Sequence, residues 1–287
     1  MLPLAEKYVN PLTDFGFKKL FGEEPNKDIL TAFLNEVLPE RHRIEELHYA
    51  KNEQLGLGQV DRRAVFDLYC RSESGERFIV ELQKAKQNFF KDRSVFYSSF
   101  PIREQAQRGD WDFRLDAVYT VGILDFVFDD SEVDELIHVV ELKDQQDRVF
   151  YDKLKYIYIE LPKFTKTADE LTTDIDKWLY VFRHLASLTD RPAALQERVF
   201  QKLFEVAKIA NFSPQEQDAY EDSLKVYRDL NNIVNTSFEE GRQEGREQGA
   251  RDRALAIARR LLAAGMSLPE VAATTGLSES ELSELED

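Results

Sequence analysis

The sequence predicts a mixed α/β domain followed by an all-α C-terminal region. Up to about residue 165, runs rich in β-branched and aromatic residues alternate with stretches of helical spacing. Beyond about residue 166 the strand-like runs stop and amphipathic helical patterns continue. We therefore expect three segments: an α/β domain at 1–165, a helical region at 166–232 on or next to its core, and 233–287, a long Gly/Arg-rich helix with a short helix-turn-helix-like end.

Helices and strands of the first segment can be placed in order. Two helices are predicted at Asp14–Phe21 and 28–38, separated by Gly22 and Pro25. A third helical stretch is expected at 89–108, where Pro101 should kink or end a first segment. Six strand-like runs are expected, at 44–50, 65–70, 78–83, 115–126, 136–142 and 156–161.

The second and third segments are predicted to be helical throughout. Amphipathic patterns cover 169–186, 193–210 and 214–230, and Ser213 before Pro214 is a favourable helix start. From residue 231 a long helical run leads to a short helical pair at the end of the chain.

Composition narrows the class of protein. Hydrophobic residues make up 43% and charged residues 32% of the 287 residues, which is typical of a folded globular chain. Cys70 is the single cysteine, which excludes an internal disulfide and suits a reducing compartment. The N-terminus lacks the pattern of a signal peptide, and no apolar run is long enough for a bilayer, so we expect a cytoplasmic protein without a membrane partner. The net charge of −16 argues against a chain that coats nucleic acid with its whole surface, but allows a local basic groove.

The stretch "VFDLYCRSESGERFIVELQ" predicts a β-hairpin with carboxylates inside apolar strands. Side chains alternate between the two faces of a strand, so each strand should have a core face and a second face carrying polar groups. The predicted core face consists of Phe66, Leu68, Cys70, Phe78, Val80 and Leu82. The second face carries Asp67, Glu81 and Gln83.

The turn of this hairpin predicts its register. A three-residue loop at 73–75 places Gly75 at the left-handed position that such loops require, so Ser72 faces Glu76. Counting outward from that pair, Asp67 lies directly across from Glu81. Like charges at such a short separation are destabilising, so a cation should lie between them. Mg²⁺, or another divalent ion such as Mn²⁺ or Ca²⁺, suits a site of carboxylate oxygens with few protein ligands.

Four short motifs in this order resemble a known family. "TDFGFKKLFG", Asp67, "VELQ" and "DRSVFYSSF" are similar to the Rpn family of recombination-promoting nucleases and transposases, within the PD-(D/E)XK superfamily. The resemblance covers roughly residues 10–165 and extends loosely to the Gly/Arg-rich tail. It implies a restriction-endonuclease-like mixed sheet flanked by helices. It also implies Asp67 and Glu81 as metal ligands, Gln83 as the residue that orients the attacking water or the scissile phosphate, and a metal-dependent DNA endonuclease as the activity.

Gln83 stands where the superfamily usually has Lys. A glutamine can position a water but cannot supply a positive charge. Its ELQ or EMQ form is typical of the family that the chain resembles. The alternative function is a catalytically weak or inactive nuclease-fold protein that acts as a DNA-binding or protein-interaction module. A blander alternative for the motif itself is an exposed strand face with scattered charges.

Further candidates surround the motif. Asp14 is either an additional acid or a first-turn residue of its helix, and Lys18 either contacts phosphate or is a solvated helix charge. Arg93 and Tyr97 lie one helical turn apart and could lean over the site or merely stack on each other. A local excess of positive charge follows the motif and suggests DNA contacts by Lys84, Lys86 and Lys91.

The C-terminal segment predicts protein contacts. Gly241, Gly245 and Gly249 recur every four residues and would form one stripe of a helix, at about 1 kcal/mol of helix propensity each. Close approach of another helix explains these glycines, so self-association as a dimer is favoured over a DNA-tracking arm. Ser267 with Glu270 and Ser278 with Glu281 form two predicted capping boxes of a helix-turn-helix. Its second helix is acidic, so a helical cap or protein-contact module is favoured over insertion into DNA.

Overall fold

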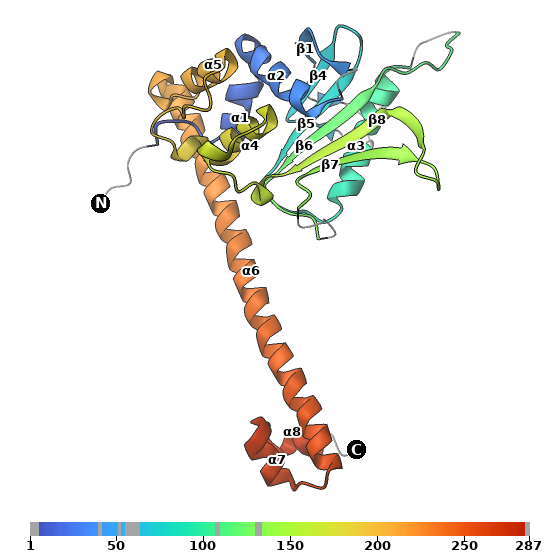
Figure 1. The fold of residues 1–287 in the computed structure, drawn as a ribbon, viewed down its shortest axis with the longest axis vertical. Coiled ribbons are helices and arrows are strands. Elements are labelled where there is room, and N and C mark those ends of the chain that lie inside the picture. The colour runs from blue at the N-terminus through green and yellow to red at the C-terminus, as the bar shows by residue number, and fades with distance from the viewer. Residues whose placement is uncertain are drawn as a thin grey trace. The chain divides into compact units, whose positions relative to one another are not determined.

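A six-stranded mixed sheet forms the centre of the N-terminal part of the chain (Figure 1), with strand order β1-β4-β5-β6-β8-β7. The computed structural model describes residues 6–39, 42–50, 53–54, 64–106, 110–129 and 134–284. Strands β5, β6 and β8 run parallel, whereas β1, β4 and β7 each pair antiparallel with their neighbours. The strands are β1 (Leu47–Tyr49), β4 (Leu68–Ser72), β5 (Arg77–Gln83), β6 (Val118–Leu124), β7 (Ile137–Lys143) and β8 (Val149–Glu160). The restriction-endonuclease-like α/β class predicted above is confirmed.

Two faces of the sheet carry separate layers of helix. On one face, helices α1 (Asp14–Phe21), α2 (Lys27–Val37), α4 (Asp174–His184) and α5 (Arg198–Val206) contribute to one large apolar core. On the other, helix α3 (Phe90–Glu104) covers two smaller clusters. Every residue of β6 is buried, as expected for a central parallel strand between two layers. The sheet is therefore a rigid support for side chains at the ends of β4 and β5.

Helix α1 begins where the sequence predicts, and its capping residue explains why. Thr13 is the N-cap, and its hydroxyl oxygen accepts a hydrogen bond from the Gly16 N–H at 3.0 Å. Helices α2 and α4 pack against α1 through aromatic side chains, with Phe21 and Phe182 stacked at 5.3 Å between ring centroids. This core includes residues from 8 to 224, so the helical segment after residue 166 contributes to it. The division at 165 and 232 stays a prediction.

Several predicted boundaries differ from the structure. Strand β8 begins seven residues before its predicted start, because its first half pairs with β7 beyond the buried core. The predicted strand at 65–70 is interrupted at Phe66–Asp67, which separates β4 from β3 (Ala64–Val65). Strand β3 pairs instead with β2 (Glu53–Gln54). Pro101 lies inside α3 and does not end it.

The interruption before β4 corrects one predicted face. Phe66 was expected on the core face with Leu68, but it packs with Tyr69, Ile79 and Phe100 on the α3 side. The chain bends at Asp67, so the strict alternation of an unbroken strand does not apply there.

The C-terminal region forms a second unit, Asp229–Asp287, distinct from Met1–Arg228. Helix α6 (Pro214–Ala263) crosses the boundary as one continuous helix, not as separate helices that end near residue 230. In the second unit, α7 (Leu268–Thr275) and α8 (Glu279–Ser283) pack against the end of α6 around Ala258, Val271 and Leu282. Both predicted capping boxes form. Single-turn 3₁₀ helices occur at Glu24–Asn26, Leu161–Lys163, Ala168–Glu170, Leu185–Ser187 and Ile209–Asn211.

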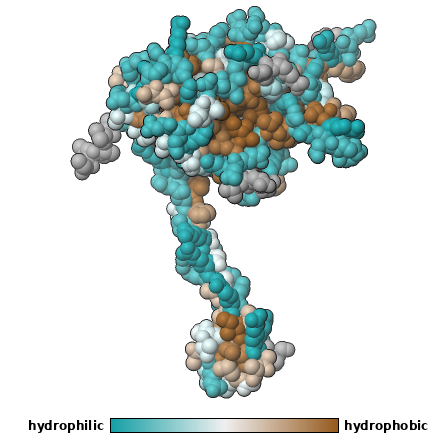
Figure 2. All heavy atoms as spheres, viewed as in Figure 1, coloured by the Kyte–Doolittle hydropathy of each residue, from teal (hydrophilic) through white to brown (hydrophobic). Residues whose placement is uncertain are grey.

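Not all apolar side chains are buried. Figure 2 shows apolar atoms gathered on the viewed face near β7, and Val139, Val140 and Leu142 of this edge strand are exposed. Helix α6 is long, but neither it nor any other helix in the described ranges has the apolar stretch that a bilayer crossing needs.

Candidate active site at the open end of the hairpin

The turn of the β4–β5 hairpin fixes the register as the sequence predicts. Gly75 has a φ of +104°, and its N–H donates to the Ser72 carbonyl at 3.1 Å. In the paired strands Leu68 lies opposite Val80 and Tyr69 opposite Ile79. Extended by one residue, this register brings Asp67 level with Glu81, just past the last paired residue of β4.

Two hydrogen bonds to the backbone hold the Asp67 and Glu81 carboxyl groups near each other. The Asp67 carboxylate accepts from the Leu82 backbone N–H at 2.7 Å, and the Asp67 N–H donates to Glu81 Oε1 at 3.4 Å. Because the chain bends at Asp67, its side chain satisfies the Leu82 N–H at the point where the β4 ladder ends. The bend therefore holds the two carboxyl groups at one end of the hairpin.

Burial disfavours the charged forms of both acids. Burial is the main cause that raises the pKa of Glu81 to about 8, and the Asp67 charge adds to it. Burial also raises the pKa of Asp67, against the effect of the Leu82 hydrogen bond. Two neighbouring carboxyls with raised pKa values are typical of a functional site, and a bound cation would fit them.

Gln83 is held in one orientation by its neighbours. Its side-chain N–H donates to the Ala85 carbonyl at 2.8 Å, and its Oε1 accepts a hydrogen bond from Arg93 of α3. Arg93 lies over the Tyr97 ring, 5.8 Å from its centroid, and its charge lowers the pKa of Glu81. Glu81, Arg93 and Tyr97 also line one small cavity between the sheet and α3. The structure thus brings α3 to the motif, and Arg93 both contacts Gln83 and stacks on Tyr97.

Asp14, Lys18 and Lys84 form the electrostatic surroundings of Asp67. Asp14 is a first-turn residue of α1 and pairs with Lys18 at 2.9 Å. Asp14 raises the pKa of Asp67, whereas Lys18 and Lys84 lower it. Burial lowers the pKa of Lys84 itself. These residues of α1 and of the segment after β5 therefore lie around Asp67.

Lys86 and Lys91 extend the candidate basic surface away from the two acids. Lys86 forms an ion pair with Asp129, and the Lys91 ammonium lies 4.9 Å from the Phe128 ring centroid. Both interact with the segment after β6, so contact with DNA would require Lys86 to leave or share its carboxylate partner.

The residues present fit a divalent cation with few protein ligands. Carboxylate oxygens are the donors that Mg²⁺ prefers, and a cation would offset the repulsion within the pair. In the described ranges, no group of three or more His, Cys, Asp and Glu side chains could hold a metal ion. Asp67 and Glu81 would hold the ion, with water completing its coordination.

Sequence reasoning missed two residues at the back of the cavity. Gly122 of β6 lies beside Glu81 in the parallel ladder, and a Cβ at this position would be 2.8 Å from the Tyr158 ring. Thr120, also of β6, lines the same cavity, and its hydroxyl is buried without a hydrogen-bond partner in the described structure. A glycine inside a run of β-branched residues was the available signal, because it marks a close approach.

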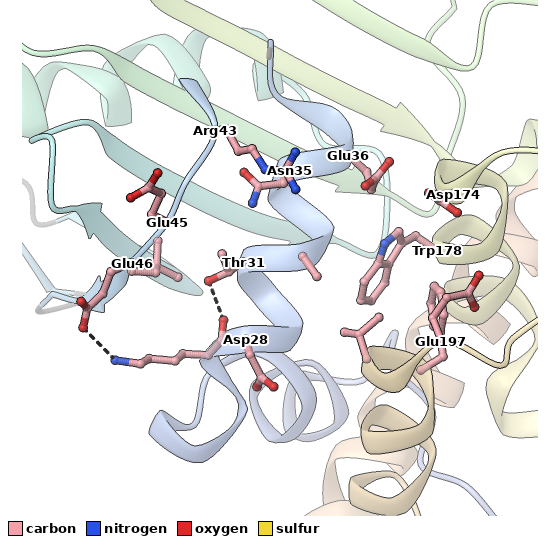
Figure 3. A pocket seen from close by; sticks show the side chains of 15 residues that line it. Asp28, Thr31, Asn35, Glu36, Arg43, Glu45, Glu46, Asp174, Trp178 and Glu197 are labelled. Carbon is pink, nitrogen blue, oxygen red and sulfur yellow. Dashed lines mark hydrogen bonds and ion pairs between the residues drawn. The ribbon is translucent and has the colours of Figure 1, made fainter. Parts of the chain in front are cut away.

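A second pocket, of about 560 Å³, contains none of the predicted site residues (Figure 3). It lies among α2, α4, α5 and the residues leading into β1, with Trp178 as one wall. Acidic side chains outnumber basic ones in its lining, which includes Asp28, Glu36, Glu45, Glu46, Asp174 and Glu197 against Lys27 and Arg43. This charge disfavours phosphate, so the pocket is a poor candidate for a phosphodiester substrate.

The sheet order, the paired carboxylates on neighbouring strands and the helix that follows them define a nuclease-like α/β fold. Comparison with protein families matches residues 11–237 to the PD-(D/E)XK nuclease family transposase model. The chain belongs to this family. Residues 251–287 match the Rpn/YhgA-like nuclease family, C-terminal HTH domain, which confirms the predicted helix-turn-helix and the predicted resemblance. The chain matches no curated protein and no solved structure.

Proposed function

We propose that the protein is a divalent-metal-dependent DNA endonuclease of the recombination-promoting type. The observation that carries the proposal is the Asp67–Glu81 pair, two carboxyls with raised pKa values held at one end of a hairpin. The family match supports a nuclease or transposase function. The substrate would be DNA, and the bond hydrolysed a phosphodiester.

Asp67 and Glu81 would hold the ion, which we expect to be Mg²⁺ or another divalent cation such as Mn²⁺ or Ca²⁺. When bound, the ion supplies a water of lowered pKa and an electrophile for the phosphate oxygens. Gln83 would orient the attacking water or the scissile phosphate. The hydrogen bond from Arg93 would fix the orientation of the Gln83 amide. The guanidinium of Arg93 would also supply the positive charge that glutamine lacks.

The path of the DNA would follow the positive charge around this end of the hairpin. Lys84 is close enough to Asp67 to lower its pKa, so it is the best placed of the three candidate lysines. Lys86 and Lys91 would contact phosphates further from the acids. Lys18 would contribute only if phosphate competes with its ion pair to Asp14.

We further propose a cytoplasmic homodimer that associates through the C-terminal helix. The described ranges hold no membrane-spanning helix. The helix-turn-helix unit would serve as a helical cap or protein-contact module, because Glu281 of α8 is already bonded to Arg251 and Ser278. No Lys or Arg is available on α8 to meet phosphate.

One observation favours a second candidate, a catalytically weak or inactive nuclease-fold module for DNA or protein binding. Both ends of the Gln83 amide are already hydrogen-bonded, to Ala85 and to Arg93. With one hydrogen bond at each end, the amide keeps only one N–H and one oxygen lone pair for a water or a phosphate, which would weaken its hold on either.

Plasmid nicking with the purified full chain tests the proposal. We expect Mg²⁺-dependent nicking by the wild type and none by Asp67→Ala or Glu81→Ala. Equal nicking by all three proteins would refute the assigned site. Retention of DNA without nicking by the wild type would favour the second candidate. Metal-dependent thermal stabilisation that is lost in Glu81→Ala tests the metal site without any choice of substrate.

A further inference from the structure

Within the second unit, an exposed face runs along α6 from residue 230 to residue 249. Leu230, Val234, Phe238, Gly241, Gly245 and Gly249 follow one another at steps of three or four residues and so share one side of the helix. We call this set the α6 apolar face. Phe238 is 66% and Val234 44% exposed, and nothing lies within 4 Å of a Cβ built at any of the three glycines. Figure 2 shows mainly hydrophilic atoms along this helix.

The two flanks of this face carry opposite charge. The tripeptide Glu-Gly-Arg occurs twice, at 240–242 and at 244–246. Successive residues of an α-helix are about 100° apart, so the residues before and after a face glycine lie on opposite flanks. Glu240 and Glu244 therefore form an acidic flank, and Arg242 and Arg246 a basic flank.

These charges are largely unused within one chain. In the described part of the chain, Glu240, Glu244 and Arg246 have no ion-pair partner, and Arg242 has only a 3.5 Å contact to Glu239. Arg251, which would weaken the acidic flank, is engaged by Glu281 at 2.6 Å. The flanks are thus available to another molecule.

We propose that the α6 apolar face packs against the same face of a second copy, with the two helices parallel. A two-fold axis along the helices brings the acidic flank of each copy against the basic flank of the other. A two-fold axis across the helices would bring acid against acid and base against base. In the parallel pair, each Glu lies within two residues of a partner Arg, about 3 Å along the axis. The glycines let the two backbones approach closely, which offsets their unfavourable helix propensity.

This inference rests on the proposed self-association and adds its direction. Parallel pairing makes both N-terminal chain segments enter the paired helices from the same end. The acidic and basic flanks also exclude partners of uniform charge, which favours a second copy over nucleic acid.

Cysteine cross-linking of the full chain tests the direction. Val234→Cys and Gln248→Cys, each in a Cys70→Ser background, lie two heptads and about 21 Å apart on the same side of α6. A short bismaleimide should link each variant to itself in a parallel pair. In an antiparallel pair at most one of them could self-link. Gln243→Cys, on the opposite side of the helix, is the matched control and should not cross-link.

Charge reversal tests the flanks independently. Glu240→Arg with Glu244→Arg should weaken the dimer at least about tenfold by light scattering, and adding Arg242→Glu with Arg246→Glu should restore it. A monomer at all concentrations, or cross-links only in a mixture of the Val234→Cys and Gln248→Cys chains, would overturn the proposal. Plasmid nicking is measured on the same variants. If the pairing fails but nicking persists, only the parallel pairing is overturned and the nuclease assignment stands.

Discussion

At the turn end of the β4–β5 hairpin, the charged side chains of Glu76 and Arg77 are each held by groups that stabilise their charge. The Arg77 guanidinium lies 3.3 Å from Asp116 and donates to the Gly75 carbonyl at 2.9 Å. Partial burial acts to raise the pKa of Glu76, but hydrogen bonds from Ser72 and Ser74 outweigh it and lower that pKa. At the open end, 67 and 81 are both acids, and the pKa of each is raised.

At the turn end of the hairpin, charged groups are therefore stabilised by their own neighbours. At the open end two acids lie together, and a cation would stabilise them. Arg93 supplies part of that charge, since it lowers the pKa of Glu81, yet the pKa remains near 8. Every residue of β5 except Glu81 is buried, and Leu82 and Gln83 at the open end are buried as well, so the difference does not come from poor folding there. It comes from the choice of residues, which is the choice expected for a metal site.

Removing the open-end acids should have the largest effect. We expect Glu81→Gln and Asp67→Asn each to reduce Mg²⁺-dependent plasmid nicking at least about a hundredfold, because each variant loses one of two metal ligands. Circular dichroism serves as the folding control. Full nicking by a folded Glu81→Gln variant would refute the assignment of Glu81 as a metal ligand.

Arg93→Gln should have the next largest effect. Loss of the contact to Gln83 and of the positive charge should lower nicking about 10–100-fold, as is usual for residues that orient metal-site groups. Arg93→Lys should recover part of the activity, because it restores the charge but not the planar fork. If Arg93→Gln and wild type have the same Mg²⁺ dependence at pH 7, Arg93 only packs against Tyr97.

At the turn end, Gly75→Ala should lower stability without changing metal affinity. The left-handed φ costs a non-glycine residue about 1–2 kcal/mol, and the new Cβ would be 2.7 Å from the Asp116 carboxylate. Urea unfolding measures the loss, and metal titration of the folded fraction provides the comparison. A large drop in metal affinity would show that the two ends of the hairpin are not independent.

The last prediction is a pH dependence that belongs to the open end alone. The pKa of Glu81 rises from 4.5 to about 8 on folding, so the folded state binds more protons between these values. Stability of the metal-free protein should therefore fall as pH rises from about 4.5 to about 8. Urea unfolding of wild type and Glu81→Gln across this range measures the difference. A saturating divalent cation should remove this difference between the two proteins. Identical pH profiles of stability in the absence of metal would contradict the raised pKa of Glu81.

Local rules predict much of this hairpin from sequence, because its register depends on one turn. The three-residue turn requires a left-handed residue at its third position, and Gly75 supplies it. Counting outward from the Ser72–Glu76 pair then aligns Leu68 with Val80, as observed. The face of Phe66 could not be predicted in this way. Alternation assumes an unbroken strand, and the bend at Asp67 ends it.

The surroundings of the acids depend on tertiary structure. Nothing in the spacing of Gln83 and Arg93 indicates that the guanidinium donates to the amide oxygen, since that contact depends on how α3 packs on the sheet. The single α6 helix was also missed as a unit. Its pattern changes near residue 230 from amphipathic to glycine-rich, although the backbone continues without a break.

The hydrogen bond from the Leu82 N–H to the Asp67 carboxylate has a consequence for sequence drift within the family. Asp67 accepts a short hydrogen bond of 2.7 Å from the Leu82 N–H, whereas Glu81 accepts only a longer one of 3.4 Å from the Asp67 N–H. A descendant released from selection for nuclease activity would lose folding stability on replacing residue 67, because a buried N–H would lose its acceptor. Replacing residue 81 would relieve repulsion. We therefore expect family members that have lost nuclease activity to keep an aspartate at the position of Asp67 and to vary first at the position of Glu81.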